Sequence, residues 1–142
     1  MAQMTPDQMD AFLARTRQAI LLTTTDDGRA TGVPVWFDWD GHAVRFFSSA
    51  TAPKVATIEA DPRIALLVTN DTDEGPAWVR FEGRAVVDHA ADAKALAVDV
   101  LAPRYWDLSE PAYASVVEQW AAAPDDALVV IELTPEAIRS SA

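Results

Sequence analysis

Short β-rich runs joined by tight turns constrain the fold of this chain more than any other feature. The run AILLTTT (19–25) stops at Asp26-Asp27-Gly28, and the run ATGVPVWFDW (30–39) stops at Asp40-Gly41, just before HAVRFFSS (42–49). Asp-Gly between two strand-like runs is typical of a β-hairpin, since glycine adopts the positive φ that such turns need. A hairpin makes its two strands pair antiparallel. We therefore expect the first part of the chain to form an antiparallel sheet.

The rest of the chain adds further strands and several helices. Strands are expected over residues 63–70, 78–88 and 127–134; helices are expected over residues 6–16, within 53–63, over 90–102 and 112–123, with a last helical turn at 135–139. Pro34 indicates an edge strand or a bulge, because proline cannot donate to a ladder. Six antiparallel strands in a chain of this size must close or be covered. The predicted fold is mainly β, an antiparallel β-barrel with flanking helices, as a single domain over residues 1–142.

Charge limits the partners that the chain can have. Its 142 residues carry a formal net charge of −11. Nucleic acid and anionic membranes are bound chiefly through clustered Lys and Arg, so neither is an expected partner. The first residues, MAQMTPDQMD, are too polar for a signal peptide, and no apolar run approaches the roughly 20 residues of a membrane span. We expect a cytoplasmic protein.

Metal and nucleophile chemistry have little support in the sequence. The chain has no cysteine, and its two histidines, His42 and His89, are not at ligand spacing. No metal site is therefore expected. No motif for hydrolysis is present either, and no catalytic side chain can be nominated.

The segment SSATAPK (48–54) is the first candidate site. Ser48, Ser49 and Thr51 carry hydroxyl groups where a strand gives way to a helix, and Lys54 is one of only two lysines in the chain. A helix N-terminus with hydroxyl groups and a cation suits a phosphate. The alternative is that Thr51 caps the helix and Lys54 points into water. Both interpretations fit the sequence.

The segment VPVWFDW (33–39) is the second candidate site. It places two tryptophans and a phenylalanine around a proline that interrupts the ladder. Backbone amides at such an interruption, with aromatic side chains beside them, can face a flat heteroaromatic ligand. The alternative is packing in the barrel core or at a subunit contact, which also remains open for Trp78, Trp106 and Trp120.

In their order, these segments resemble the FMN-binding split-barrel family of pyridoxamine 5′-phosphate oxidases. The similar stretches are TTTDDGRATGVPVWFDWDG (23–41), FFSSATAPKVATIEADPRIALLV (46–68) and WVRFEGRAVV (78–87). The resemblance implies a six-stranded antiparallel split barrel of the FMN-binding type. It also implies a homodimer with FMN or a deazaflavin coenzyme (F-420) at the interface and a small-molecule substrate. The cofactor-binding residues that it implies are Val33, Pro34, Val35 and Trp36 against the ring, and Ser48, Ser49, Thr51 and Lys54 around the phosphate.

The chain departs from this family at several of its motif positions. Ala52-Pro53 replace the Ser-Arg that commonly precedes the lysine, and Ala56-Thr57 replace an Arg and an Asn. The resemblance implies a flavin- or deazaflavin-dependent oxidoreductase that transfers a hydride to or from a small organic substrate. The alternatives are a flavin, deazaflavin or haem carrier without turnover, and a dimeric barrel that has lost its cofactor.

Overall fold

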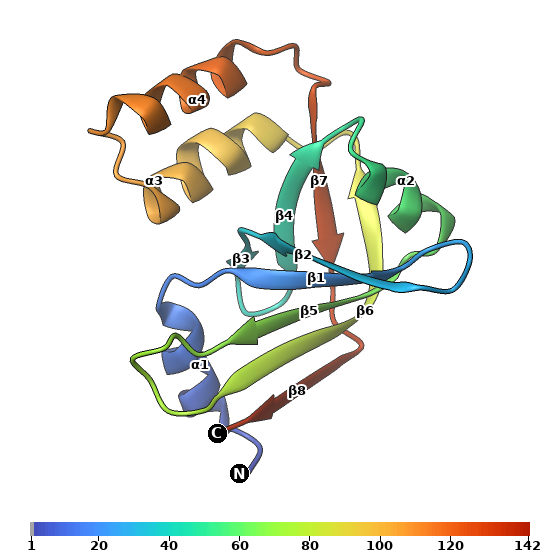
Figure 1. Ribbon diagram of the computed structural model, residues 1–142, viewed down its shortest axis with the longest axis vertical. Helices are drawn as coiled ribbons and strands as arrows, with labels where there is room; N and C mark the ends of the chain where they lie inside the picture. Colours follow the sequence, from blue (N-terminus) through green and yellow to red (C-terminus); the bar gives the residue numbers. More distant parts are fainter. Residues whose placement is uncertain (1) are drawn as a thin grey trace.

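A computed structural model describes residues 2–142 and shows an antiparallel sheet curled into a half-barrel with flanking helices (Figure 1). The strands are β1 (Ala19–Thr24), β2 (Ala30–Val35), β3 (Asp38–Trp39), β4 (Val44–Ser49), β5 (Arg63–Thr69), β6 (Trp78–Asp88), β7 (Leu128–Leu133) and β8 (Ala137–Ser141). Their order in the sheet is β2-β1-β5-β6-β7-β4-β3, and β8 pairs with β6. Every pair is antiparallel. The mainly β split-barrel fold expected from the sequence is therefore confirmed.

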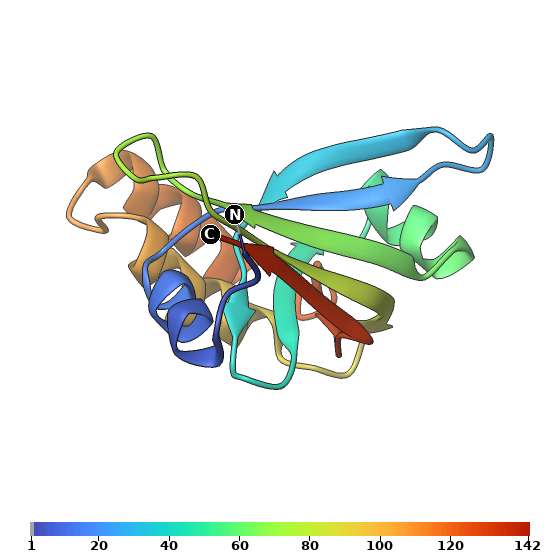
Figure 2. The same ribbon diagram turned by 90° about the horizontal axis from the view of Figure 1, so that it is seen from below.

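The helices are α1 (Pro6–Ala14), α2 (Pro53–Ala60), the π-helix η1 (Ala95–Leu101), α3 (Ala102–Tyr105) and α4 (Pro111–Ala122). Helix α1 begins at Pro6, as expected from the sequence. The Thr5 hydroxyl accepts the Gln8 N–H, and the Gln8 side chain accepts the Thr5 N–H. Helix α2 lies against one end of the half-barrel, whereas α3 and α4 form a separate layer beside β4 and β7 (Figure 1). The N- and C-termini lie side by side (Figures 1 and 2), joined by hydrogen bonds between Ala2 and Ala142.

The predicted strand over residues 30–39 is in fact two strands. Residues 30–35 form β2, which pairs with β1, and residues 38–39 form β3, which pairs with β4. Strands β2 and β3 therefore lie at the two opposite edges of the sheet. The chain passes from one edge to the other through Trp36 and Phe37, which belong to neither strand. Pro34 lies in β2, and β2 is an edge strand, as the proline predicted.

The predicted helical turn at 135–139 is wrong, because residues 137–141 form strand β8. Strand β6 is long enough for one edge to serve two partners: its residues 78–82 pair with β8 and its residues 85–88 pair with β7. A single helical turn has little stability of its own, whereas an unpaired strand edge offers a row of hydrogen bonds. Long-range pairing therefore decided the conformation of this segment.

Gly83 lies on β6 where its partner changes from β8 to β7. A Cβ atom there would lie 3.0 Å from Leu133 Cδ1 and 3.1 Å from the Glu136 nitrogen. The close approach of the β7–β8 connection therefore requires glycine at this position. Its neighbours on the same face, Val79, Phe81 and Ala85, are buried.

The core has two parts. The main cluster fills the half-barrel and includes Phe46 and Phe81, both fully buried. A second, smaller cluster lies under the helical layer, where Leu96 and Leu101 pack on Val130 of β7. Among residues 2–142, none of the helices has the length and apolar character that a bilayer crossing requires.

Candidate functional site

A cavity of about 370 Å³ lies between the half-barrel and the helical layer. Residues from β2, β4, the start of α2 and the α3–α4 region surround it. They are Gln18, Pro34, Val35, Trp36, Phe47, Ser48, Ser49, Lys54, Trp106, Trp120 and Leu128. The two segments singled out in the sequence therefore meet at one cavity, although they are separated along the chain.

Six of the eight residues predicted to bind a cofactor line this cavity: Pro34, Val35, Trp36, Ser48, Ser49 and Lys54. The other two do not. Val33 is 41% exposed on the edge strand β2, and the Thr51 hydroxyl lies 3.2 Å from the Ser49 hydroxyl.

Thr51 does not cap α2, so that alternative interpretation of the segment is wrong. Ala52 occupies the N-cap position, and no side chain among residues 2–142 accepts a hydrogen bond there. Pro53 has no N–H, and the Val55 N–H donates to the Ala52 carbonyl oxygen over 3.0 Å, so the Lys54 N–H is the group of the first turn that no side chain satisfies. An N–H group at a helix start carries partial positive charge and can receive an anion.

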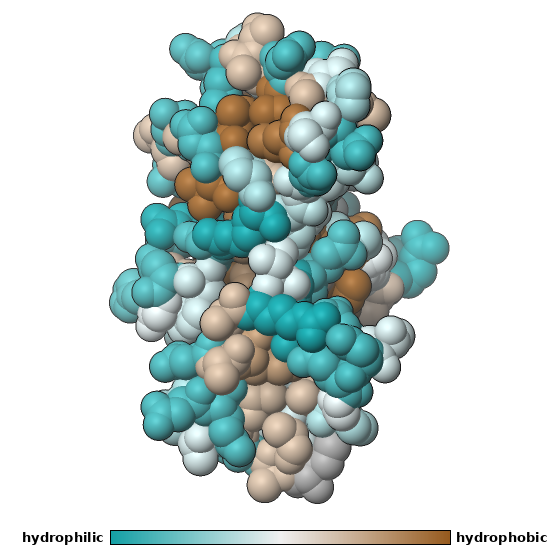
Figure 3. Space-filling model, turned by 90° about the vertical axis from the view of Figure 1, so that its left-hand side faces the viewer, coloured by the Kyte–Doolittle hydropathy of each residue, from teal (hydrophilic) through white to brown (hydrophobic). Residues whose placement is uncertain are grey.

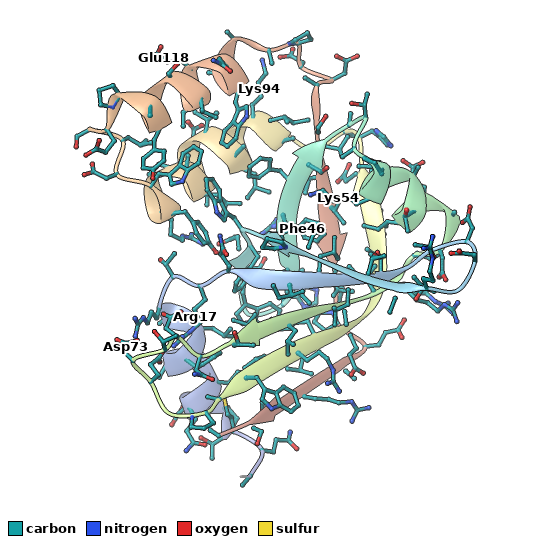
Figure 4. All side chains as sticks on the ribbon, in the orientation of Figure 1. Arg17, Phe46, Lys54, Asp73, Lys94 and Glu118 are labelled. Carbon is teal, nitrogen blue, oxygen red and sulfur yellow. The ribbon has the colours of Figure 1, made fainter. Side chains whose placement is uncertain are left out.

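Lys54 adds a full positive charge to the same turn of α2. Its side chain is half-buried, and burial lowers the pKa of the ammonium group. No carboxylate within residues 2–142 forms an ion pair with it. The half-buried side chain is partly shielded from water, whereas the alternative interpretation expects it to extend into water. Figure 4 shows Lys54 near the end of β4, between that strand and α2.

Lys94, the other lysine, has a structural role. Its ammonium nitrogen lies 3.2 Å from Asp125 Oδ1 and 3.2 Å from the Ala121 carbonyl oxygen. It therefore joins the start of η1 to the end of α4, and it lies well away from Lys54 in Figure 4. The contrast shows that only one of the two lysines is without a counter-charge in the described part of the chain.

The hydroxyl groups at the end of β4 belong to two different environments. Ser48 is buried, and its hydroxyl donates to the Ser49 carbonyl oxygen over 2.9 Å. Ser49 is exposed and hydrogen-bonds with Thr51. Ser49 is therefore the more accessible hydrogen-bond donor for a ligand, whereas the Ser48 hydroxyl is already bonded to the backbone at the end of β4.

An aromatic wall closes the cavity on the side of the helical layer; we define it as Trp36, Phe47, Trp106 and Trp120. The rings of Trp106 and Trp120 are stacked, with centroids 5.7 Å apart and planes at 15°. Trp36 meets Trp106 edge-on at 4.7 Å and 89°. Phe47 meets Trp120 at 5.3 Å and 70°. These are favourable aromatic geometries.

Sequence reasoning did not place Trp106 and Trp120 at the site. One signal was available, because Tyr113 and Trp120 are seven residues apart on α4 and so share one helix face. Where that face would lie relative to β2 and β4 could not be read from the spacing. Gln18, Phe47 and Leu128 were also missed, and no local pattern marks them.

The sequence pattern of the pyridoxamine 5′-phosphate oxidase family matches residues 5–142, nearly the whole chain. The chain belongs to this family. A search of curated protein sequences finds no significant match.

Solved structures with the family's split-barrel fold agree with the assignment. An F420 reductase is 22% identical, with a TM-score of 0.62, and the match covers 91% of this chain and 94% of that one. An FAD-binding protein from Mesorhizobium loti is 18% identical, with a TM-score of 0.65 and coverage of 98% and 93%. The haem storage protein HutZ from Vibrio cholerae is 14% identical, with a TM-score of 0.69 and coverage of 94% and 92%. At these identities the similarity shows a common fold.

The departures from the family motif fall on α2 and leave Lys54 as the charged residue of the cavity lining. Ala52 and Pro53 form the helix start, and Ala56 is exposed. The Thr57 hydroxyl donates to the Pro53 carbonyl oxygen over 3.1 Å, so it is engaged within the helix. An anion at this helix start would thus meet one ammonium group and the Lys54 backbone N–H rather than an arginine fork.

A cluster of charged side chains lies away from the cavity lining, at the loop between β5 and β6. Asp71, Asp73 and Glu74 bring carboxylate oxygens within 4.8 Å of one another. Arg15 contacts all three carboxylates, and the buried Arg17 pairs with Glu74. The cluster is therefore an ion-pair network that ties this loop to the segment after α1, and it needs no metal ion.

Proposed function

We propose that this protein binds FMN or a deazaflavin coenzyme (F-420) in the cavity and uses it to transfer a hydride to or from a small organic substrate. The observation that carries the proposal is Lys54, a half-buried cation without a carboxylate partner among residues 2–142, at a helix start that no side chain caps. A half-buried charge is costly unless something compensates it. A phosphate group would compensate it.

The charge of the lining supports an anionic ligand. Lys54 is the one charged residue among the lining residues that the structure describes, and none of them is acidic. The chain as a whole has 22 acidic and 11 basic residues. The cavity therefore has the opposite charge from most of the molecule, as binding an anion requires.

The other end of the cavity suits a flat ring. Strand β2 is the edge of the sheet, so one row of its backbone groups has no strand partner, and Pro34 and Trp36 lie at its cavity end. Unpaired backbone groups can bond the polar edge of a heteroaromatic ring, and Trp36 can pack beside it. When bound, a flavin-type cofactor supplies the hydride chemistry, and the protein positions it and excludes water.

We also propose a homodimer whose partner covers the outer face of β1 and β5. Buried and half-buried residues alternate along both strands, so that Ile20, Leu22 and Leu67 turn away from the core. Ile20 and Leu67 are cross-strand partners and form a continuous apolar strip. A second copy that covered this strip would bury it symmetrically.

A carrier of the same cofactor without turnover is the second candidate function. The cavity lining favours a carrier, because Lys54 is the one titratable side chain among the described lining residues. The lining therefore offers no pair of acid and base groups for catalysis. Haem is less suitable, since His42 and His89 both lie outside the lining and an axial ligand would be needed.

The test is titration of the purified protein with FMN, with deazaflavin coenzyme F-420 and with riboflavin, which has the flavin ring but no phosphate. Saturable binding of FMN or F-420, and markedly weaker binding of riboflavin, is expected. Equal affinity for FMN and riboflavin would contradict the phosphate site. Failure of all three to bind would indicate a barrel that has lost its cofactor. Reduction of the bound cofactor, followed by reoxidation with added substrates, separates an enzyme from a carrier.

A further inference from the structure

A groove of about 370 Å³ lies where the helical layer ends on the outer face of the sheet, and it shares no lining residue with the cofactor cavity. Two neighbouring rows of outward side chains explain it. In one row, Val130 of β7 and Phe47 of β4 pack under the helical layer. The next row crosses β6, β7, β4 and β3, and its successive cross-strand partners are Val86, Glu132, Arg45 and Asp38. The groove runs between this second row and η1.

The floor of the groove is apolar. Leu96 and Val130 are buried there, and the small side chains of Ala91 and Ala95 leave the space above them open. Val100 of η1 also lines the groove and is 37% exposed. On the face shown in Figure 3, hydrophobic side chains gather at the upper, helical end of the molecule. A partner that covered the groove would remove apolar surface from water, which is favourable.

The apolar surface continues beyond the groove. Val86, the cross-strand partner of Glu132, is 63% exposed, the highest value among the exposed large hydrophobic residues of the described chain. Valine is favoured in a strand, but exposure of this degree leaves most of its side chain without packing partners. The occupant of the groove can therefore gain further apolar contact by extending along the sheet.

The walls of the groove are negatively charged. Its lining holds one guanidinium group, from Arg45, and four carboxylates, from Asp38, Asp88, Asp92 and Glu132. Arg45 is engaged by Asp40 at 2.8 Å. Glu132 is half-buried and forms no ion pair or side-chain hydrogen bond among residues 2–142. A partly buried carboxylate without a partner is costly, and a cationic group would compensate it.

An arginine side chain combines the two properties that the groove requires. Its long stem packs on apolar surface, and its planar guanidinium group binds a carboxylate through two parallel hydrogen bonds. We infer that the groove is a docking site for a basic, partly apolar peptide segment of another protein. An arginine of that segment lies beside Glu132, and its apolar side chains cover Val86 and Val100. This interaction is additional to the proposed function.

The test compares three probes of equal positive charge on the full-length protein. They are the peptide acetyl-LRLRLRL-amide, the peptide acetyl-GRGRGRG-amide, which lacks the apolar side chains, and spermidine, a polyamine. Fluorescence anisotropy of a labelled LRLRLRL peptide, with the other two as competitors, measures their affinities. Salt at about 0.15 M screens general attraction to the acidic surface. The LRLRLRL peptide is expected to bind at least about tenfold more tightly than either competitor, because only it buries apolar surface.

Variants then locate the binding through charge. Glu132→Gln is expected to weaken LRLRLRL binding about threefold to tenfold, since the arginine loses its charged partner. Glu118→Gln is the matched control, because Glu118 is an exposed glutamate of α4 outside the groove lining. It removes the same charge from the protein and should leave the affinity unchanged.

A second pair of variants tests the apolar contact without any change of charge. The double variant Val86→Thr/Val100→Thr keeps side-chain shape but replaces methyl groups by hydroxyls, so about a threefold to fivefold loss of LRLRLRL affinity is expected. Val33→Thr is the control, because Val33 is also exposed but lies on β2, outside the groove lining.

Three results would overturn the inference. One is equal affinity of the wild-type protein for the two peptides, or no binding of either, a comparison that needs no variant to fold. Another is spermidine binding as tight as that of LRLRLRL, which would indicate a polyamine site instead of a peptide site. The third is unchanged LRLRLRL affinity in both Glu132→Gln and the valine double variant, which would place the peptide elsewhere on the acidic surface.

Discussion

Tyr105 lies flat against Trp36, with ring centroids 4.9 Å apart and planes at 8°. The Tyr105 hydroxyl accepts the Phe37 N–H over 3.3 Å and donates to the Arg17 carbonyl oxygen. One side chain from α3 thus holds both the ring of Trp36 and the backbone where the chain leaves β2. Tyr105 is therefore a positioning residue for the aromatic wall.

Removing the Tyr105 hydroxyl should destabilise the protein while leaving the stack in place. Tyr105→Phe is expected to lower the free energy of unfolding by about 1 kcal/mol, because the Phe37 N–H loses its partner. Tyr105→Leu should cost more and also release Trp36. Urea unfolding measures the first effect, and the near-ultraviolet circular dichroism of the tryptophans measures the second. Identical spectra for the Phe and Leu variants would show that the stack does not hold Trp36.

Loss of the Lys54 charge should weaken cofactor binding selectively. Lys54→Ala is expected to weaken the binding of FMN or F-420 by about 1.5–3 kcal/mol, the range for a hydrogen bond to a charged group. The binding of riboflavin, which lacks the phosphate, should hardly change. Lys94→Ala is the matched control, since Lys94 pairs with Asp125 away from the cavity. Equal losses for FMN and riboflavin in the Lys54 variant would place the phosphate elsewhere.

A methyl group at Gly83 should destabilise the sheet. The added Cβ would meet Leu133 and the Glu136 backbone at 3.0 and 3.1 Å, and backbone cannot move aside cheaply. Gly83→Ala is expected to cost about 1–3 kcal/mol, as overpacking does. Gly75→Ala is a suitable control, because a Cβ there would meet nothing within 4 Å. Equal urea midpoints for the two variants would mean that the β7–β8 connection yields freely.

Acid should remove the contribution of the Arg17–Glu74 pair. Hydrogen bonding to Arg17, and to the Asp71 N–H, lowers the pKa of Glu74 from 4.5 to about 2. Because the pKa is lower in the folded state, the stabilisation is fully present above about pH 4.5 and is lost as the pH falls towards 2. Glu74→Gln should therefore unfold at a lower temperature than the wild type at pH 7, and the difference should shrink below pH 4.

Thermal unfolding from pH 7 to pH 2.5 measures this difference. The control is Glu118→Gln, which changes an exposed glutamate of α4 that forms no ion pair among residues 2–142. A difference for Glu74→Gln that stayed constant over the whole range would rule out titration of Glu74 as its cause.

A charge on the outer strip of the sheet should separate the proposed dimer. Leu67→Glu places a carboxylate beside Ile20 on the face that the partner would cover, and a buried unpaired charge is costly. Light scattering after size exclusion is expected to give a dimer for the wild type and a monomer for Leu67→Glu. Val86→Glu is the control, because Val86 is 63% exposed on β6. A monomeric wild type would refute the proposed homodimer.

Local signals were enough for much of the fold. Gly28 and Gly41 both have the positive φ of tight turns, so the two turns predicted from Asp-Gly are confirmed. Pro34 correctly indicated an edge strand. Strand β8 was missed, because its conformation depends on the free edge of β6, far away in the sequence. The boundary between β2 and β3 was missed for the same reason, since each pairs with a different strand.

The sequence by itself determined the antiparallel pairing and the position of SSATAPK between a strand and a helix, because turn and helix-start preferences act between near neighbours. Only the tertiary structure decided that Ala52, and not Thr51, is the N-cap of α2, and that Lys54 is half-buried without a carboxylate partner within residues 2–142. It also decided that Trp106 and Trp120 face the same cavity as Lys54. The physical reason is that burial and charge pairing depend on residues distant in the chain, which spacing along the sequence does not encode.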